Sequence, residues 1–296
     1  MKKYALLLYG SLRSYKSAYK YLSNTLLLNN NVDIFISTHK CMSISSHLLK
    51  DRLPETFQNI YGNNLKNISY IEDIDQTYLI ALIKEKIKII DKDLYDLHIH
   101  EIQKITNLNE WYSFYSKLYY KDDMGFYFKN KQNFIYLLHE IIMLYHRYNA
   151  FLELESYSKT NNILYDGVIL YRPDLFHKQP ISLDNLIFRD DVIYFRIDFM
   201  VISTYNGIKN FTKNLLKEYY LLNNKKNAED TYLSETQHTI FLGNNFRYTF
   251  CVLDLFDHYR SIDDSNSVPL SFPGSPPENL ESSINELYNN LKNKIS

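Results

Sequence analysis

The stretch "YALLLYGSLRSYKSAYKYLSNTLLLNNNVDIFIST", residues 4–38, decides the fold class of this chain. It begins with a short apolar run that Gly10 closes, which is typical of a strand buried on both faces of a mostly parallel sheet. Apolar and aromatic residues then recur at helical spacing from Tyr15 to Leu26, before a second buried run, "VDIFIST", at 32–38. A strand, a helix and a strand in this order form a βαβ unit. We therefore expect an α/β fold with a Rossmann-like, mostly parallel central sheet flanked by helices.

The remaining segments fit the same class. We expect a helical insertion at about 75–159, because apolar residues keep a 3.6-residue period there. Strand patterns return in "YDGVILYRPDLF" (165–176), "DNLIF" (184–188) and "DVIYFRIDFMVIST" (191–204), and a helical pattern follows at 205–222. A short capped helix, "SETQHTIFLGNNF", and a last strand, "YTFCVLDLF", complete the expected elements.

The chain divides into three expected parts. Residues 1–266 carry the α/β pattern. The stretch "SVPLSFPGSPP" (267–277) is rich in Pro and cannot continue regular structure, which predicts a linker. Residues 278–296 place apolar side chains at helical spacing from Leu280 to Ile295. This amphipathic C-terminal helix is a candidate for homo-oligomerisation, for contact with a membrane surface, or for simple capping of the domain.

Composition and charge exclude several classes of protein. Lys and Arg number 33 against 34 Asp and Glu, for a net charge of -1, so the phosphate-neutralising excess of a dedicated nucleic-acid binder is missing. The two cysteines, Cys41 and Cys251, form neither a disulfide framework nor a zinc knuckle. The opening apolar run is shorter than a secretory signal, and no stretch approaches the ~20 apolar residues of a membrane helix. We expect a soluble, cytoplasmic protein.

Several familiar catalytic and binding motifs do not occur. There is no GxxxxGK[ST] and no GxGxxG after the first strand, which excludes the usual P-loop, dinucleotide and methyl-donor sites. His139 and Glu140 begin like a zinc-protease helix, but Met143 stands at the second ligand position. The His98-x-His100 pair could chelate a metal, but an isolated HxH pair without carboxylate support is more often structural or at the surface.

The segment 109–128 is dense in aromatic residues. Its side chains could form a satisfied aromatic core or, alternatively, a platform on which sugar rings stack. The core is the favoured interpretation.

Polar residues follow three of the predicted buried strands. In open α/β sheets, ligands bind outside the carboxyl ends of the strands, where backbone amides and helix N-termini face outward. We therefore expect these residues to converge on a ligand. They are Gly10, Ser11 and Arg13 after the first strand, Thr38 and His39 after the second, and Arg172 and Asp174 after "YDGVILY".

The turn "LYRPD" is the most informative of the three strand ends. Pro173 stiffens it, while Arg172 and Asp174 place a guanidinium and a carboxylate at the rim of the sheet. Such a pair suits a diphosphate, because Asp can hold a bridging divalent metal and Arg can neutralise charge directly. The alternative is an ion pair that only closes the turn, and spacing alone slightly favours it.

The order of five motifs resembles a group of glycosyltransferases. "YALLLYGSLRSY", "NVDIFISTHK", "YDGVILYRPDLF", "RIDFMVIST" and "SETQHTIF" are similar in order to motifs of bacterial and viral enzymes with the nucleotide-sugar-binding GT-A fold, of the kind related to WavE lipopolysaccharide-synthesis proteins. That group typically carries Gly-x-x-Arg after the first strand, a "DIFIHTW"-like second strand and "YDxVIxxRPDL". A family Pro-Glu before a late helix reads Ser234-Glu235 here. The match spans most of residues 1–262.

The resemblance implies a fold and a nucleotide site. Residues 1–266 would form a GT-A-like catalytic domain that moves a sugar from a nucleotide-diphosphate donor to a glycan, lipid-linked or protein hydroxyl. Gly10, Ser11 and Arg13 would grip the nucleotide. Thr38 and His39 would lie near its base or ribose.

The resemblance also implies the chemistry, with one departure. Arg172-Pro173-Asp174 stands where GT-A enzymes usually carry Asp-x-Asp, so either Asp174 binds Mn²⁺ or Mg²⁺ with other ligands, or Arg172 neutralises the leaving diphosphate without a metal. Asp198 is the leading candidate for the base or for positioning the acceptor, and Glu235 is the next. His238 is a weaker candidate for a late metal ligand.

Two rival functions remain open. The chain could be a non-catalytic α/β scaffold that binds glycans or partners after losing the metal motif, and Arg172 in place of the first Asp favours that possibility. A nucleotidyltransferase would need a Gly-rich signature and paired carboxylates near the first strand, and the sequence has neither.

Overall fold

The computed structural model is an α/β domain, and the part of the chain that it describes carries the expected sheet. The described residues are 2–10, 15–40, 57–90, 92–111, 113–114, 128–173, 175–177, 180–196, 200–222, 249–252, 258–260 and 270–271.

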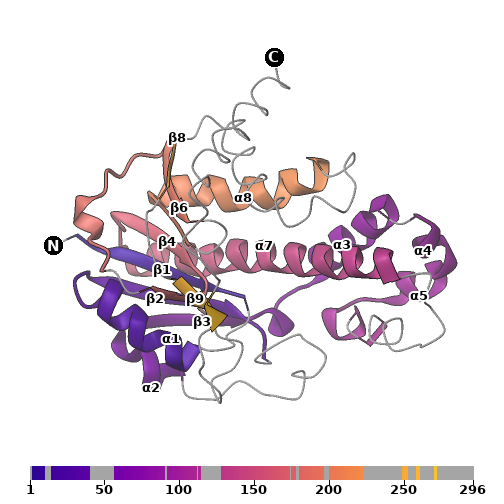
Figure 1. Ribbon diagram of the computed structural model, residues 1–296, viewed down its shortest axis with the longest axis horizontal. Helices are drawn as coiled ribbons and strands as arrows, with labels where there is room; N and C mark the ends of the chain where they lie inside the picture. The colour runs from indigo at the N-terminus through magenta and orange to yellow at the C-terminus, as the bar shows by residue number, and fades with distance from the viewer. Residues whose placement is uncertain are drawn as a thin grey trace.

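Seven strands form the central sheet, in the order β3-β2-β1-β4-β7-β6-β8. Strands β3, β2, β1 and β4 are parallel, and β6 is parallel to β8, whereas β7 runs antiparallel to both of its neighbours. This mostly parallel sheet, flanked by helices, confirms the expected fold class and is consistent with a GT-A-like fold (Figure 1). The strands are β1 (Tyr4–Tyr9), β2 (Val32–Thr38), β3 (Leu65–Tyr70), β4 (Gly167–Tyr171), β6 (Val192–Arg196), β7 (Met200–Ser203) and β8 (Thr249–Val252).

A second, small sheet follows the end of β4. It has the order β10-β9-β5, with both pairs antiparallel. Its strands are β5 (Leu175–His177), β9 (His258–Arg260) and β10 (Leu270–Ser271).

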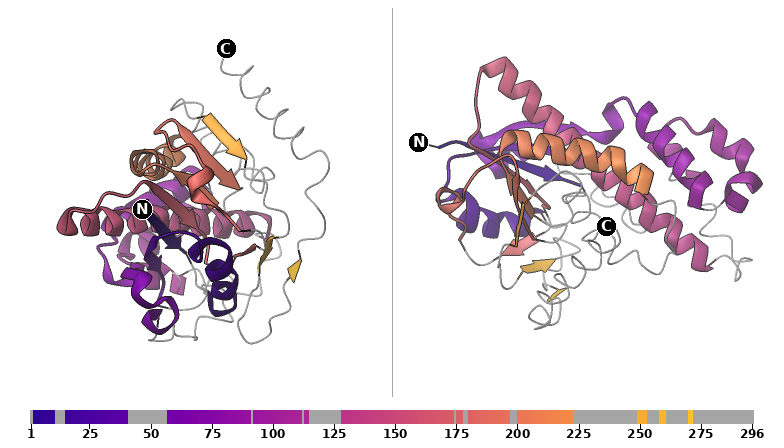
Figure 2. Two further views of the ribbon diagram at one scale, coloured as in Figure 1. Left: turned by 90° about the vertical axis from the view of Figure 1, so that its left-hand side faces the viewer. Right: turned by 90° about the horizontal axis from the view of Figure 1, so that it is seen from above.

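Helices cover both faces of the central sheet, so the domain has three layers (Figures 1 and 2). The long helix α7 crosses one face with α8 beside it, while α1 and α2 cover the other. The helices α3, α4 and α5 form a group beyond the carboxyl ends of the strands (Figure 1). The helices are α1 (Tyr15–Leu22), α2 (Phe57–Tyr61), α3 (Thr77–Ile90), α4 (Lys92–Leu97), α5 (Ile99–Lys104), α7 (Phe128–Asn161) and α8 (Tyr205–Leu222).

The alternation of side chains along β1 builds two separate cores. Successive residues of a strand point to opposite faces, so a strand covered on both faces must be apolar throughout. Leu7 belongs to the core beneath α7 and α8, whereas Leu6 and Leu8 belong to the core beneath α1 and α2. Every residue of β1 is at most 1% exposed. The continuous apolar run at the start of the chain follows from this double burial.

The helical spacing read from Tyr15 to Leu26 is also confirmed. Tyr15, Leu22 and Leu26 are buried against the sheet, and Tyr19 packs on the same core. The α-helix ends at Leu22, and a π-helical turn, Ser23–Leu27, leads into β2.

Two expected strand segments differ from the structure. The "DNLIF" segment at 184–188 is not a strand, because a 3-10 turn occupies Leu183–Asn185 and the chain then continues irregularly. The segment 191–204 is divided between β6 and β7, which pair antiparallel. Its two apolar runs therefore lie side by side.

At the amino ends of the strands, charged residues close the sheet. The carboxylate of Asp33, at the start of β2, is 2.8 Å from the Lys3 ammonium and 3.5 Å from that of Lys66. Tyr165 donates its hydroxyl hydrogen to the same carboxylate at 2.7 Å. Burial and this bond raise the pKa of Tyr165 far above its ordinary value. Asp33 is thus buried with two cations and a hydroxyl group, which is how a buried carboxylate is tolerated.

The aromatic-rich segment belongs to the core where the structure describes it. Trp111 is fully buried and packs edge-on against Phe114, with ring centroids 5.7 Å apart. Within the described residues, no helix is long and apolar enough to cross a membrane.

Candidate functional site

Gly10 forms a partly exposed turn of backbone directly after β1. Its φ of +88° lies in the left-handed region that favours glycine. The Gly10 amide donates to the Ser37 carbonyl at 3.0 Å, and its carbonyl accepts from the Thr38 hydroxyl at 2.7 Å. A Cβ built on Gly10 would meet no heavy atom of the described residues within 4 Å. The end of β2 therefore holds this turn from one side, and none of the described residues fills the side on which a Cβ would lie.

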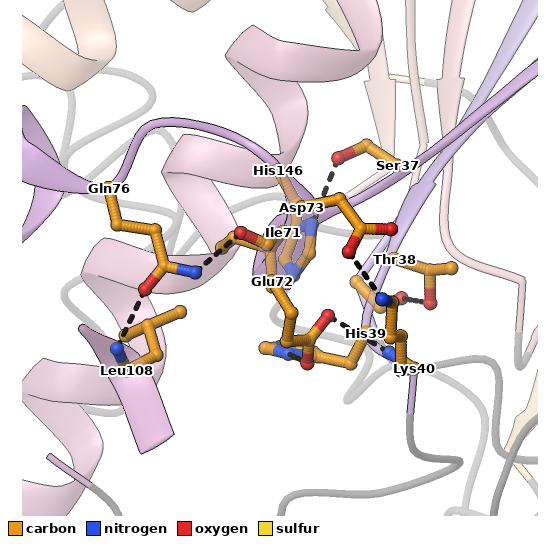
Figure 3. Close-up of polar contacts among 11 residues, drawn as sticks. Ser37, Thr38, His39, Lys40, Ile71, Glu72, Asp73, Gln76, Leu108 and His146 are labelled. Carbon is orange, nitrogen blue, oxygen red and sulfur yellow. Dashed lines mark hydrogen bonds and ion pairs between the residues drawn. The ribbon is translucent and has the colours of Figure 1, made fainter. Parts of the chain in front are cut away.

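Thr38 and His39 sit at the carboxyl end of β2, next to that turn. Both are buried, at 0% and 1% exposure. The Thr38 hydroxyl donates to the Gly10 carbonyl, and this hydrogen bond fixes the turn. His39 lies with its Nδ1 atom 3.2 Å from Glu72 Oε1 (Figure 3).

Glu72, just beyond β3, holds the chain after β2. Its second oxygen accepts from the Lys40 backbone amide at 3.0 Å, and the Lys40 ammonium pairs with neighbouring Asp73 (Figure 3). Burial raises the pKa of Glu72, but hydrogen bonds from His39 and from backbone amides outweigh it, so the pKa lies below its ordinary value. Glu72 is consequently a carboxylate at neutral pH.

His146 reaches the same place from α7. Its Nδ1 atom lies 3.0 Å from Ser37 Oγ, and its ring packs edge-on against His39 with centroids 4.6 Å apart. Ser37 Oγ also accepts from Asn149 Nδ2 at 3.1 Å, and the tautomer of His146 decides which of Ser37 and His146 donates in the bond between them. Burial, and then the nearby His39, hold the pKa of His146 well below its ordinary value. His146 is therefore a neutral imidazole at pH 7.

Arg147 brings a cation to the last residue of β1. Its guanidinium lies over the ring of Tyr9, 4.8 Å from the centroid, and the residue is 3% exposed. A guanidinium over an aromatic face is held by the ring quadrupole. Arg147 thus places a buried guanidinium beside the last residue of β1.

Of the residues expected from the sequence, the structure brings together Gly10, Thr38 and His39. Arg172 directly follows β4, the neighbour of β1, and is partly exposed at the same edge of the sheet. The other predicted site residues lie outside the described residues. They are Ser11, Arg13, Asp174, Asp198 and Glu235, together with His238.

Sequence reasoning missed the polar residues that support this edge. Glu72 follows β3, a strand whose partly exposed pattern gives no buried run to recognise. His146 and Asn149 lie within a long apolar helix, where a single polar residue is ordinarily a satisfied core residue. A signal was present in "LYHRYNAF", which places His, Arg and Asn within one helical turn of a buried helix.

Within the described residues, no group of three His, Cys, Asp or Glu side chains is placed to hold a metal ion. Asp174, the residue expected to bind a metal, lies outside that part of the chain.

Comparisons with known proteins find a distant structural likeness but no match in sequence. No family model matches the chain, and no curated protein matches its sequence. Among solved structures, the chain is similar to the apo-form glycosyltransferase GlyE of Streptococcus pneumoniae TIGR4, with a TM-score of 0.31 and 11% sequence identity. The likeness covers 85% of this chain and 45% of that chain, so this chain spans less than half of that protein's length. The fold assignment rests on the order and direction of the strands themselves.

Proposed function

We propose that this protein is a glycosyltransferase that binds a nucleotide-diphosphate sugar at the carboxyl edge of its sheet. The observation that carries the proposal is the Gly10 turn, which is bonded to β2 through both its amide and its carbonyl and is open on the side a Cβ would fill. An open glycine turn after the first strand lets a ligand approach the backbone closely. The motif order that resembles WavE-like and viral enzymes supports the same assignment.

The donor would lie across the ends of β1, β2 and β4. Gly10, Ser11 and Arg13 would contact its phosphates or ribose, with the end of β2 on the nucleoside side. Arg172 would neutralise the diphosphate, since a guanidinium binds phosphate oxygens with two hydrogen bonds. Asp174 would add Mn²⁺ or Mg²⁺ as a bridging ion if the enzyme uses a metal.

The acceptor would be a hydroxyl group of a glycan, of a lipid-linked sugar or of a protein. Sugar transfer with inversion needs a carboxylate to remove the acceptor proton. Asp198 is the proposed base, and Glu235 is the second candidate.

A non-catalytic scaffold that binds glycans or partner proteins is the second candidate function. The observation that favours it is Arg172 at a position where an acidic residue would help to hold the metal. Such a scaffold would bind no nucleotide and would transfer no sugar.

Thermal unfolding with a panel of ligands tests the proposal. The panel contains UDP, GDP, CDP, their common sugar conjugates and S-adenosylmethionine, each with Mn²⁺ and with EDTA. A ligand that binds only the folded state raises its stability, so one nucleotide diphosphate should raise the melting temperature. Dependence of that shift on Mn²⁺ would assign a metal role, and an Asp174→Asn variant should then lose it. The absence of a shift with every nucleotide would contradict the proposal and favour the scaffold.

A further inference from the structure

Ser37 is the second-last residue of β2 and is held by helix α7 as well as by the neighbouring strands. His146 and Asn149 both contact its hydroxyl oxygen, at 3.0 Å and 3.1 Å. Asn149 also donates to Ser69 on β3 at 2.7 Å. A single turn of α7 thus fixes β2 and β3 at their carboxyl ends.

The backbone of the same residue leads to the Gly10 turn. The Ser37 carbonyl accepts the Gly10 amide, and the adjacent Thr38 hydroxyl donates to the Gly10 carbonyl. A short polar chain therefore runs from His146 through Ser37 to Gly10. Glu72 secures the following residues, because it accepts from Lys40 N and contacts His39.

A buried histidine is a costly way to hold Ser37 in place. His146 is 1% exposed, and its Nε2 atom is buried without a hydrogen-bond partner among the described residues. An apolar residue of similar size would avoid that cost. The Nδ1 bond to Ser37 is the contact that an apolar residue could not make.

We propose that His146 is a positioning residue, which acts through Ser37 to hold the Gly10 turn in the conformation that receives the donor nucleotide. The role at the nucleotide rests on the proposed function, whereas the restraint on Gly10 does not. The two can therefore be measured separately. His146 itself contacts no ligand in this proposal.

Two substitutions distinguish the effect of the His146–Ser37 hydrogen bond from the effect of packing by the His146 ring. His146→Phe keeps an aromatic ring beside His39 and removes the Nδ1 atom that contacts Ser37. His146→Asn keeps a polar atom near the Nδ1 position and removes most of the ring. Glu101→Gln is the matched control, because Glu101 pairs with His98 at 3.7 Å on the distant helical group.

The first readout is hydrogen exchange of the Gly10 amide, measured by NMR without a ligand. His146→Phe should speed exchange at Gly10 by about tenfold, as expected when one supporting hydrogen bond is lost. The Asp166 amide, bonded to the Lys3 carbonyl at the opposite edge, should keep its rate. His146→Asn and Glu101→Gln should stay near the wild-type rate at both amides. Equal acceleration at Gly10 and Asp166 would mean a general loss of stability and would overturn the proposal.

The second readout is affinity for the nucleotide diphosphate that stabilises the wild type most. His146→Phe should weaken binding by about tenfold and His146→Asn by about threefold or less, in line with the loss or retention of one hydrogen bond. Wild-type affinity together with wild-type exchange at Gly10 in His146→Phe would overturn the inference. If the wild type binds no nucleotide while Gly10 exchange still depends on His146, the proposed function fails and the restraint on Gly10 stands.

Discussion

The two ends of β2 carry buried polar residues of opposite character. At the amino end, Asp33 meets Lys3, Lys66 and the Tyr165 hydroxyl, so charge is balanced by charge. At the carboxyl end, the hydroxyls of Ser37 and Thr38 meet a neutral imidazole and a glycine backbone. The same strand is therefore held by ion pairs at one end and by hydrogen bonds between neutral groups at the other.

This difference follows from the direction of parallel strands. Their carboxyl ends face the loops and helix N-termini that bind ligands, whereas their amino ends face the turns that only close the sheet. Substitutions at Asp33 should thus act on stability alone. Substitutions near Gly10 should act on binding more than on stability.

The largest expected effect is at Asp33. Asp33→Asn keeps the size of the side chain but removes the charge opposite Lys3 and Lys66, and should lower the free energy of unfolding by about 3 kcal/mol. Urea unfolding followed by circular dichroism measures the change. Nucleotide affinity of the fraction that stays folded should match the wild type, and a loss of affinity at Asp33 would break the contrast between the two ends.

The next effect is at Gly10. Gly10→Ala forces an L side chain into a left-handed backbone conformation, which should cost about 1–2 kcal/mol of stability. Its methyl group would also fill the open side of the turn, so nucleotide binding should weaken by more than tenfold. Calorimetric titration measures the affinity. Unchanged affinity would show that the ligand does not approach this turn.

The pH dependence of the free energy of unfolding distinguishes His146 from Glu72, which both lie near the carboxyl end of β2. The folded-state pKa of His146 lies well below its ordinary value of 6.5, so only the unfolded chain gains this proton as the pH falls below 6.5. Stability should then fall by up to ~1.4 kcal/mol per pH unit. Glu72, whose pKa is lowered from 4.5, should act only below that pH.

The charged and titratable groups nearest to His146 in the described hydrogen-bond network come from three elements. His39, which follows β2, packs against His146; Glu72, beyond β3, contacts His39 and the Lys40 amide; and Arg147 is the next residue on α7. Urea unfolding of the wild type and of His146→Phe between pH 7 and 5 isolates the His146 contribution, because all other groups are shared. Equal pH slopes for the two proteins would contradict a buried neutral His146.

How much of this the sequence could predict differs between the fold and the site. The apolar runs at β1, β2 and β4 were recognisable because both faces of each strand are covered, and α8 kept a clear helical period. Gly10, Thr38 and His39 were found because they directly follow such strands. Glu72 and His146 were not, since their roles depend on which helix crosses the sheet and at what register, and no local pattern encodes that.

The smallest expected effect is seen by comparing two buried threonines that make the same kind of hydrogen bond. Thr38 and Thr25 are both buried and both donate to a backbone carbonyl at 2.7 Å. Replacing either by Val should lower the free energy of unfolding by about 1 kcal/mol, because one partly buried carbonyl loses its side-chain donor. Only Thr38→Val should also weaken nucleotide binding, by several-fold. Equal affinities in the two variants would mean that the bond to Gly10 does not matter for the ligand.

The most direct measurement is NMR mapping of the bound nucleotide diphosphate on backbone amides of the whole protein. The proposed function predicts that amides at Gly10, 37–40 and 71–73 shift on titration while those at Asp33 and Asp166 do not. Shifts confined to other parts of the sheet, or no shifts with UDP, GDP or CDP in the presence of Mn²⁺, would contradict a nucleotide site at the carboxyl edge.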